Sequence, residues 1–204
     1  MIACTTPIVR EYRTLAQVPR WSIVRLVRQQ SVLEHTALVA IYADMIADLV
    51  EYTGDRAELM REALRHDLAE VETGDLPSPV KRRLGPAAIR ESYESEILAV
   101  RYGIHDGPAD NTMHWIIKVA DLTEAVLKLT EEKSLGNQSI TNVLHNLLQI
   151  LDGVISGAPL NHDRKAALWS AIEQAIKHEY SGQDGVQNAH VERGSVLFSE
   201  ALSK

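Results

Sequence analysis

Three His-Asp dipeptides occur in the chain, and an adjacent imidazole and carboxylate can hold a metal ion. They are His66-Asp67, His105-Asp106 and His162-Asp163. Asn161 precedes the last pair and is a good helix N-cap, so Asp163 is explained by the favourable effect of an acid in the first helical turn. Glycines and a proline surround the second pair, as is typical of a turn. These two pairs are therefore explained without a metal.

The pair His66-Asp67 differs because it lies in a segment that predicts a helix, between Leu64 and Leu68. Glu70 follows one turn later, so the three polar side chains are expected on one side of that helix. The segment TGDLPSPVK comes next, and sites are often built on loops of this kind. Taken alone, the pair is explained equally well by a buried histidine that pairs with a neighbouring carboxylate.

Two distant segments strengthen the case for a metal. His35 lies early in the apolar segment SVLEHTALVA, and Asp121 lies in the middle of WIIKVADLTEAVLKL. A carboxylate there needs a cation, which is either Lys118 or a metal ion. Together with His66 and Asp67, these residues supply two imidazoles and two carboxylates, which suit Mn²⁺, Co²⁺, Fe²⁺ or Zn²⁺. Four such ligands leave room for water and a substrate oxygen on the metal.

The elements that must position these residues are helices, because the chain has no strong strand signals. Gly54 closes the first clear helix and Asp55 is the expected N-cap of the next. In the first helix the apolar residues at helical spacing are Leu38, Ile41, Met45, Ile46 and Leu49. Helices are expected over about 32–51, 55–72, 86–103, 111–133, 139–156 and 162–181. Gly74, Pro77 and Pro79 are expected to break the second helix.

Length and composition fit one all-α domain. The chain has 204 residues, of which 45% are hydrophobic and only 5% aromatic, a balance that favours helices over a β-sandwich. We expect a single helical bundle of about six or more helices over residues 1–181. Residues 182–204 are expected to form a C-terminal tail, either frayed or used as an oligomer contact.

Charge and cysteine content exclude several classes of protein. The net charge of −7 argues against a general nucleic-acid binder, which needs a broad basic face. No apolar run is long enough to span a membrane. The single cysteine, Cys4, excludes an internal disulfide and a cysteine-based zinc site. A reduced, cytoplasmic setting is expected, which is the host cytoplasm if the protein is phage-encoded.

The order His, His-Asp, Asp resembles the HD-domain superfamily of metal-dependent phosphohydrolases. The match extends to Arg20-Trp21, to EHT at residues 34–36, to HDLAEVETGDLPSPVK and to KVADLTEA. These segments are similar to the bacterial 5′-deoxynucleotidase branch, to which a phage dATP triphosphohydrolase also belongs. The similarity covers about residues 18–130 and implies an HD-type helical bundle.

The resemblance implies a role for each matching position. One divalent transition metal (Co, Mn, Zn or Fe) would be held by His35, His66, Asp67 and Asp121. Glu70 would position or activate the attacking water, and Arg20 would bind phosphate. These assignments agree with the needs of phosphate hydrolysis, which uses a Lewis acid, an activated water and cations. Arginine suits bidentate phosphate binding, and a carboxylate near the metal ligands can act as a base.

The remaining implied contacts concern the sugar, the base and further phosphate oxygens. Asp75 would lie near the 3′-hydroxyl, and the Trp21 ring would crowd out a ribose 2′-hydroxyl. The other contacts would come from Lys81 and Lys118 for phosphate, and from Ile23 and Pro79 for the base. Each residue also has an ordinary structural explanation: Trp21 could be core, and Asp75 could cap the turn after Gly74. Their joint occurrence in one order favours the site.

The implied substrate is a 2′-deoxynucleotide. The bacterial relatives cleave 5′-monophosphates to the deoxynucleoside and phosphate, whereas the phage relative removes triphosphate from dATP. Ile23, two residues after Trp21, is similar to the phage enzyme's base-selecting arrangement and points to adenine. Motif spacing does not set the number of phosphates removed, so the monophosphate reaction is expected first, on family frequency, with dATP triphosphohydrolysis as the alternative.

Two other classes of function compete with this reading. The chain could be a non-catalytic helical interaction protein with a relic site, but the intact ligand set and Glu70 argue against it. It could also act on signalling nucleotides, which the TGDLPSPVK loop disfavours. The family resemblance implies a homodimer or larger homo-oligomer, and the helices after residue 139 could supply the contacts.

Overall fold

The computed structural model describes residues 6–83, 87–102, 104 and 110–181. Within this part of the chain the secondary structure is helical, apart from one isolated bridge between Pro19 and Ser31, which confirms the all-α prediction. The helices are α1 (Thr6–Leu15), α2 (Val32–Leu49), α3 (Arg56–Arg65), α4 (Glu70–Thr73), α5 (Ser78–Arg83), α6 (Ala87–Tyr102), α7 (Asn111–Ser134), the 3₁₀ turn η1 (Gln138–Ile140), α8 (Thr141–Ser156) and α9 (His162–Ser181).

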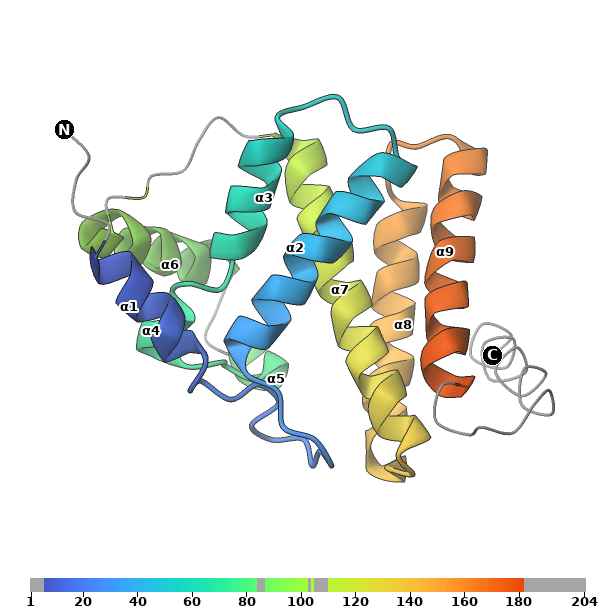
Figure 1. Ribbon diagram of the computed structural model, residues 1–204, viewed down its shortest axis with the longest axis horizontal. Helices are drawn as coiled ribbons and strands as arrows, with labels where there is room; N and C mark the ends of the chain where they lie inside the picture. The colour runs from blue at the N-terminus through green and yellow to red at the C-terminus, as the bar shows by residue number, and fades with distance from the viewer. Residues whose placement is uncertain (1–5, 84–86, 103, 105–109, 182–204) are drawn as a thin grey trace.

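Helix α7 is the centre of the bundle. It packs against α2, α8 and α9, and α3 packs against α2 and also contacts α7. Figure 1 shows α2, α7, α8 and α9 running beside one another. Ile116, Val119 and Leu129 of α7 are fully buried in the main core. Because α7 is covered on several sides, it can carry polar side chains into the interior, where they need partners.

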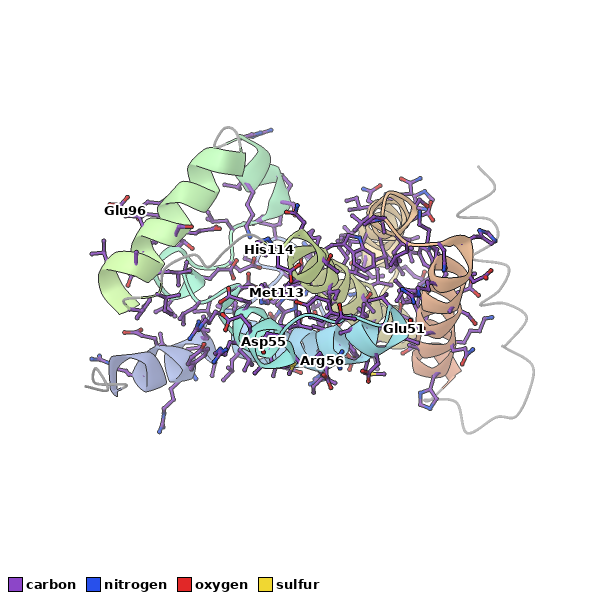
Figure 2. All side chains as sticks on the ribbon, turned by 90° about the horizontal axis from the view of Figure 1, so that it is seen from above. Glu51, Asp55, Arg56, Glu96, Met113 and His114 are labelled. Carbon is purple, nitrogen blue, oxygen red and sulfur yellow. The ribbon has the colours of Figure 1, made fainter. Side chains whose placement is uncertain are left out.

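A second, smaller apolar cluster supports the helices on the N-terminal side of the molecule. Leu15, Val32 and Leu68 are fully buried there, and Leu98 of α6 packs against them. Seen from above, α6, marked by Glu96, lies apart from the bundle of α2, α7, α8 and α9 (Figure 2). This cluster fixes the turn that holds Leu68, and Asp67 precedes it directly.

The helix predicted over 55–72 is interrupted. Helix α3 ends at Arg65 and α4 begins at Glu70, with turns over 66–69 between them. The Leu68 amide bonds to the Arg65 carbonyl at 2.8 Å and the Glu70 amide to the Asp67 carbonyl at 3.0 Å. The prediction that His66, Asp67 and Glu70 lie on one continuous helix is therefore wrong. The tighter turns over 66–69 let the side chains of His66 and Asp67 both point toward the buried His35.

The first predicted helix is confirmed as α2, but most of the apolar residues whose spacing indicated it do not face the core. Ile41, Met45 and Leu49 are exposed by 53%, 58% and 38%. The buried face of α2 instead carries Val39, Ile46 and small residues, together with His35. The small residues are Ala40, Ala43 and Ala47. Helix α2 is apolar on more than one face, so spacing alone does not decide which face meets the core.

Helix boundaries agree well with the predicted caps. The Asp55 carboxylate accepts hydrogen bonds from the first-turn amides of α3, and Asn161 accepts one from the Arg164 amide at the start of α9 at 2.9 Å. The prediction that Asp163 lies in a first helical turn is confirmed. Gly74 ends α4 with a φ of 67°, a conformation that favours glycine.

The short helices α1 and α5 were not predicted. Helix α5 starts inside the expected break and carries Pro79 in its first turn, where proline is tolerated. The pair His105-Asp106 and the predicted tail 182–204 lie outside the described residues. Among the helices described, none has the length and apolar character needed to cross a membrane.

Candidate active site

The predicted metal ligands converge on one point between α2, α7 and the turn after α3. His35 is fully buried, and its Nε2 lies 3.5 Å from Asp67 Oδ2 and 3.4 Å from Asp121 Oδ1. His66 Nε2 lies 3.2 Å from the same oxygen of Asp67. One ligand atom from each of His35, His66 and Asp121 lies within 4.8 Å of the others. Three segments far apart in sequence therefore bring their donors together.

Both imidazoles present the same nitrogen to this point. His66 Nδ1 donates to the Ala63 carbonyl at 2.7 Å, and His35 Nδ1 lies 2.5 Å from Glu124 Oε2. The Nε2 atoms of both rings are buried without a hydrogen-bond partner. An unsatisfied ring nitrogen that faces carboxylate oxygens needs a cation between them. The donor set thus fits a divalent metal held by His35, His66, Asp67 and Asp121.

The electrostatics of the metal-free cluster show the same need for positive charge. Burial lowers the pKa of His66, but the Asp67 and Asp121 carboxylates raise it to about 9. Burial raises the pKa of Asp121, yet its contacts with His35 and Lys118 hold it well below its usual range. The carboxylates therefore stay charged and the imidazole binds a proton, in the place that a metal cation would take.

Arg20 lies directly beside this cluster. Its Nη1 is 3.4 Å from Asp67 Oδ2, and its guanidinium lies 5.7 Å from the centre of the Trp21 ring. The Arg20 Nε is buried and has no hydrogen-bond partner. A largely buried guanidinium with an unused donor next to the predicted metal ligands is suited to bind an anionic oxygen.

Trp21 has an unusual backbone that the surrounding residues hold in place. Its φ is 62°, a strained value for a residue with a large side chain. The Trp21 amide donates to Asp75 Oδ2 at 3.0 Å. Asp75 therefore fixes the backbone of Trp21, and the two residues predicted to shape a sugar pocket are in contact.

A cavity of about 420 Å³ adjoins the cluster, a size typical of small-molecule sites. Asp121 belongs to both the cluster and the cavity lining, so it joins them. The predicted site residues that line this cavity are Arg20, Trp21, Ile23, Asp75, Pro79, Lys81, Lys118 and Asp121. The structure thus places the predicted phosphate, sugar and base contacts around one space.

Glu70 is buried, and one of its oxygens has a clear partner. Lys81 Nζ lies 3.2 Å from Glu70 Oε1, whereas Glu70 Oε2 is buried without a hydrogen-bond partner. Burial, followed by the nearby Asp67 charge, raises the pKa of Glu70 to about 8. A carboxyl group whose pKa lies near neutrality is well matched to proton transfer.

The two lysines predicted to contact phosphate are both ion-paired. Lys81 pairs with Glu70, and Lys118 Nζ lies 2.8 Å from Asp121 Oδ2. Lys118 is half exposed and was the non-metal explanation for Asp121. The structure shows that Asp121 has this lysine on one oxygen and His35 on the other.

Sequence reasoning missed two groups of residues around the site. Glu124 lies one turn after Asp121; it belongs to the matching segment KVADLTEA, but no role was predicted for it. Helix α8 supplies a wall of the cavity through Val143, Asn146, Leu147 and Ile150. No sequence signal distinguished these residues of α8 from ordinary core or surface positions.

Comparisons with known proteins agree with this geometry. The model of the family described as 5′-deoxynucleotidase YfbR-like matches residues 9–95. A 5′-deoxynucleotidase of Photorhabdus laumondii is 32% identical over 158 residues, which cover 67% of this chain and 79% of that relative. A 5′-deoxynucleotidase of Yersinia pseudotuberculosis is 32% identical over 160 residues, covering 67% of this chain and 80% of the relative.

Solved structures share the fold. The cyanophage S-2L HD phosphohydrolase DatZ, bound to dA and one catalytic Zn²⁺ ion, superposes with a TM-score of 0.66 at 22% identity, covering 82% of this chain and 95% of DatZ. An HD-domain phosphohydrolase of Listeria innocua gives a TM-score of 0.64 at 16% identity, covering 97% of this chain and 98% of the other. The fold is that of the HD phosphohydrolases, and the chain belongs to the YfbR-like 5′-deoxynucleotidase family.

Proposed function

We propose that this protein is a metal-dependent 5′-deoxynucleotidase, which hydrolyses a 2′-deoxynucleoside 5′-monophosphate to the deoxynucleoside and phosphate. One observation carries the proposal: the buried Nε2 atoms of His35 and His66 have no hydrogen-bond partner, yet they lie 3.2 to 3.5 Å from carboxylate oxygens of Asp67 and Asp121. This cluster opens through Asp121 onto a cavity that Arg20 also lines. Family membership supports the same reaction.

The metal ligands would be His35, His66, Asp67 and Asp121. When bound, a divalent ion supplies Lewis-acid stabilisation of the phosphoryl charge and lowers the pKa of a water. The Arg20 guanidinium would bind a phosphate oxygen through its Nε, a buried donor that has no hydrogen-bond partner. Glu70 would take a proton from the attacking water, because its free oxygen is buried and its pKa lies near neutrality.

The nucleoside would occupy the remainder of the cavity. Trp21 and Asp75 are proposed to hold the sugar, since the tryptophan ring lines the cavity and its amide binds the Asp75 carboxylate. Ile23 and Pro79 are proposed base contacts, and both line the same cavity. The α8 residues would complete the apolar surface that a base requires.

The charges around the cavity favour a monophosphate over a triphosphate. Among the described residues that line it, the cations are Arg20, Lys81 and Lys118. Each of these is already paired with a carboxylate. Arg20 still has a buried, unused Nε donor for one phosphate group. The additional negative charges of a triphosphate would need further cations, and both lysines are already paired. The dATP triphosphohydrolase reaction is the alternative outcome of the test; the position of Ile23 after Trp21 concerns the base and points to adenine in either reaction.

A substrate panel tests the proposal. Purified protein with Mn²⁺, Co²⁺ or Zn²⁺ is incubated with the four dNMPs, the four dNTPs and the matching ribonucleotides. The products are separated by anion exchange, so that phosphate and triphosphate are distinguished. The proposal requires phosphate from dNMPs, with dAMP among the best substrates. Triphosphate from dATP would favour the phage-type reaction, and no hydrolysis with any metal would contradict both.

We also propose a cytoplasmic homo-oligomer. The exposed apolar residues Ile41 and Met45 on α2 support self-association. Light scattering on the purified protein would give its mass, and a monomer of 22.7 kDa would contradict this proposal.

A further inference from the structure

A buried chain of hydrogen bonds runs from the Trp21 indole to the proposed metal ligand His35. Trp21 Nε1 donates to Gln30 Oε1 at 3.2 Å. Gln30 Nε2 donates to Glu124 Oε1 at 2.6 Å, and Glu124 Oε2 lies 2.5 Å from His35 Nδ1. Gln30 and Glu124 are each only 2% exposed, and His35 is 0% exposed. Water therefore does not satisfy the polar atoms of these three residues, and each residue depends on its neighbours in this series of hydrogen bonds.

The direction of every hydrogen bond in this chain is determined by its two ends. An indole nitrogen can only donate, so the Gln30 atom that it meets must be the amide oxygen. The Gln30 amide nitrogen is then left to donate to Glu124. An ionised carboxylate can only accept, so Glu124 requires a proton on His35 Nδ1. Neither an amide flip of Gln30 nor the other neutral tautomer of His35 satisfies all four groups.

This direction has a consequence for the metal centre. With the proton held on Nδ1, the neutral His35 ring has its lone pair on Nε2. That atom faces Asp67 and Asp121 at 3.5 and 3.4 Å. A neutral imidazole with the lone pair turned to the ligand cluster is the form that binds a metal. The same series of hydrogen bonds holds the indole of Trp21. The strained backbone of Trp21 is fixed separately by Asp75.

We infer that Gln30 and Glu124 are positioning residues, which set the tautomer and orientation of His35 for metal binding and hold the Trp21 ring at the edge of the sugar pocket. Neither residue lines the cavity among the described contacts. Glu124 acts on the metal through His35, and Gln30 acts on the substrate through Trp21. The part concerning Trp21 rests on the proposed function, whereas the part concerning His35 rests on the metal centre alone.

Glu124→Gln tests the role of Glu124 most directly, because it preserves the size of the side chain and changes one of its two acceptor atoms to a donor. The new amide nitrogen must face either the Gln30 amide nitrogen or the Nδ1 proton of His35, so one pair of donors opposes. Zinc affinity, measured by competition with a chromogenic chelator, is expected to fall about 10- to 100-fold, the usual effect of removing a partner of a metal-bound histidine.

Glu132→Gln is the matched control. Glu132 is on the same helix and is also fully buried, and it accepts hydrogen bonds from the Val27 and Arg28 amides. It has no contact with the metal ligands among its described bonds. Glu132→Gln is expected to lower the melting temperature while zinc affinity stays within about twofold of the wild type. This control separates loss of a buried carboxylate from loss of the histidine's partner.

A second readout reports the tautomer directly. Histidine labelled with ¹⁵N in the zinc-loaded protein should show a slowly exchanging Nδ1 proton for His35, shifted downfield by the carboxylate. The signal should move upfield or disappear in Glu124→Gln and remain in Glu132→Gln. Gln30→Leu is a second variant, to be used if Glu124→Gln does not fold. It should weaken zinc binding less than Glu124→Gln does, and it should reduce the discrimination between deoxynucleotide and ribonucleotide.

Unchanged zinc affinity and an unchanged Nδ1 proton in Glu124→Gln would overturn the inference, even if the wild-type protein hydrolyses dNMPs. If Glu124→Gln does not fold, unchanged zinc affinity and sugar discrimination in Gln30→Leu would overturn it. Conversely, weaker zinc binding in Glu124→Gln would support the role of Glu124 even if no deoxynucleotide proved to be a substrate. Failure of the inference and failure of the proposed function are thus distinguished.

Discussion

His35 and His66 lie with their ring centroids 5.4 Å apart and tilted by 59°, and both turn Nε2 to the same oxygen of Asp67. Each ring uses its Nδ1 for a different acceptor, Glu124 in one case and the Ala63 carbonyl in the other. Helix α2 and the turn after α3, which are distant in sequence, therefore present equivalent nitrogen atoms to one carboxylate. This relationship is the basis of the first predictions.

Asp67→Ala should abolish metal binding, because Asp67 Oδ2 lies within 3.5 Å of both imidazoles. Metal content after dialysis and the thermal shift on adding Mn²⁺ or Zn²⁺ measure this. Asp163→Ala, in the pair His162-Asp163, is the control: it should retain the metal and lose only about 0.3–1 kcal/mol of stability from the start of α9. Stoichiometric metal in Asp67→Ala would contradict the assignment.

Metal binding should become tighter as pH rises from about 6.5 to about 9. The pKa of His66 in the metal-free protein is raised to about 9, from an ordinary value of about 6.5, so a proton must leave before the ring binds metal. Isothermal titration in buffers of different ionisation enthalpy should detect proton release at pH 7. Affinity independent of pH across this range would contradict the prediction.

The stability of the metal-free protein should have the opposite pH dependence. Because the folded pKa of His66 exceeds the unfolded value, the stabilisation is fully present below about pH 6.5 and is lost as pH rises through about 9. The raised pKa of Glu70 also makes the metal-free protein less stable as pH rises. The melting temperature of chelator-treated protein should therefore fall over this range. The difference between its melting temperature and that of the metal-loaded protein should widen.

Glu70→Gln should slow turnover by at least about a hundredfold, the usual effect of losing an acid or base, with metal affinity retained. The amide keeps the size of the side chain and its contact with Lys81, but it cannot take a proton. Glu72→Gln is the control, because Glu72 is exposed on the same short helix. Full activity of Glu70→Gln would remove Glu70 from the proton transfer.

Long helices and their caps could be predicted from the sequence, whereas the exact faces could not. Asp55 and Asn161 are local signals, because each caps the turn that follows it. The face of α2 that is buried depends on α7, a helix about eighty residues away, and α2 has apolar residues on both sides. The break at residues 66–69 likewise depends on packing of Leu68 against Leu15 and Val32, which no local pattern contains.

The convergence of the proposed metal ligands could be predicted because their residue types are costly to bury without a cation. The residues behind them could not. Gln30 and Glu124 meet only after the segment before α2 is placed on α7, and neither has a recognisable spacing from His35. The α8 wall of the cavity was missed for a similar reason, since Leu147 and Ile150 have the pattern of any amphipathic helix.

Trp21→Ala should reduce discrimination between dAMP and AMP by about tenfold, since a pocket that excludes a hydroxyl by shape gives at most about a hundredfold preference. Trp21→Phe keeps a ring but lacks the indole donor to Gln30, so it should fall between Trp21→Ala and the wild type. The ratio of kcat/KM values for the two nucleotides measures both. Unchanged selectivity in Trp21→Ala would remove this residue from the sugar pocket.

Ile150→Asp should raise the KM for dAMP about tenfold, with a smaller change in kcat, because it replaces an apolar cavity wall by a charge that repels the substrate. Gln149→Asp is the matched control: it adds the same charge on the adjacent, exposed residue, which does not line the cavity. Equal KM values for the two variants would mean that α8 does not contact the substrate.

Metal titration of phosphate release tests the central claim most directly. Chelator-treated protein is supplied with increasing Mn²⁺, Co²⁺ or Zn²⁺, and phosphate released from dAMP is measured alongside Asp67→Ala and Asp163→Ala. The account predicts activity that rises to a plateau at one metal ion per chain, persists in Asp163→Ala and is absent in Asp67→Ala. Phosphate release that chelation does not diminish, or no release from any deoxynucleotide with any of these metals, would contradict it.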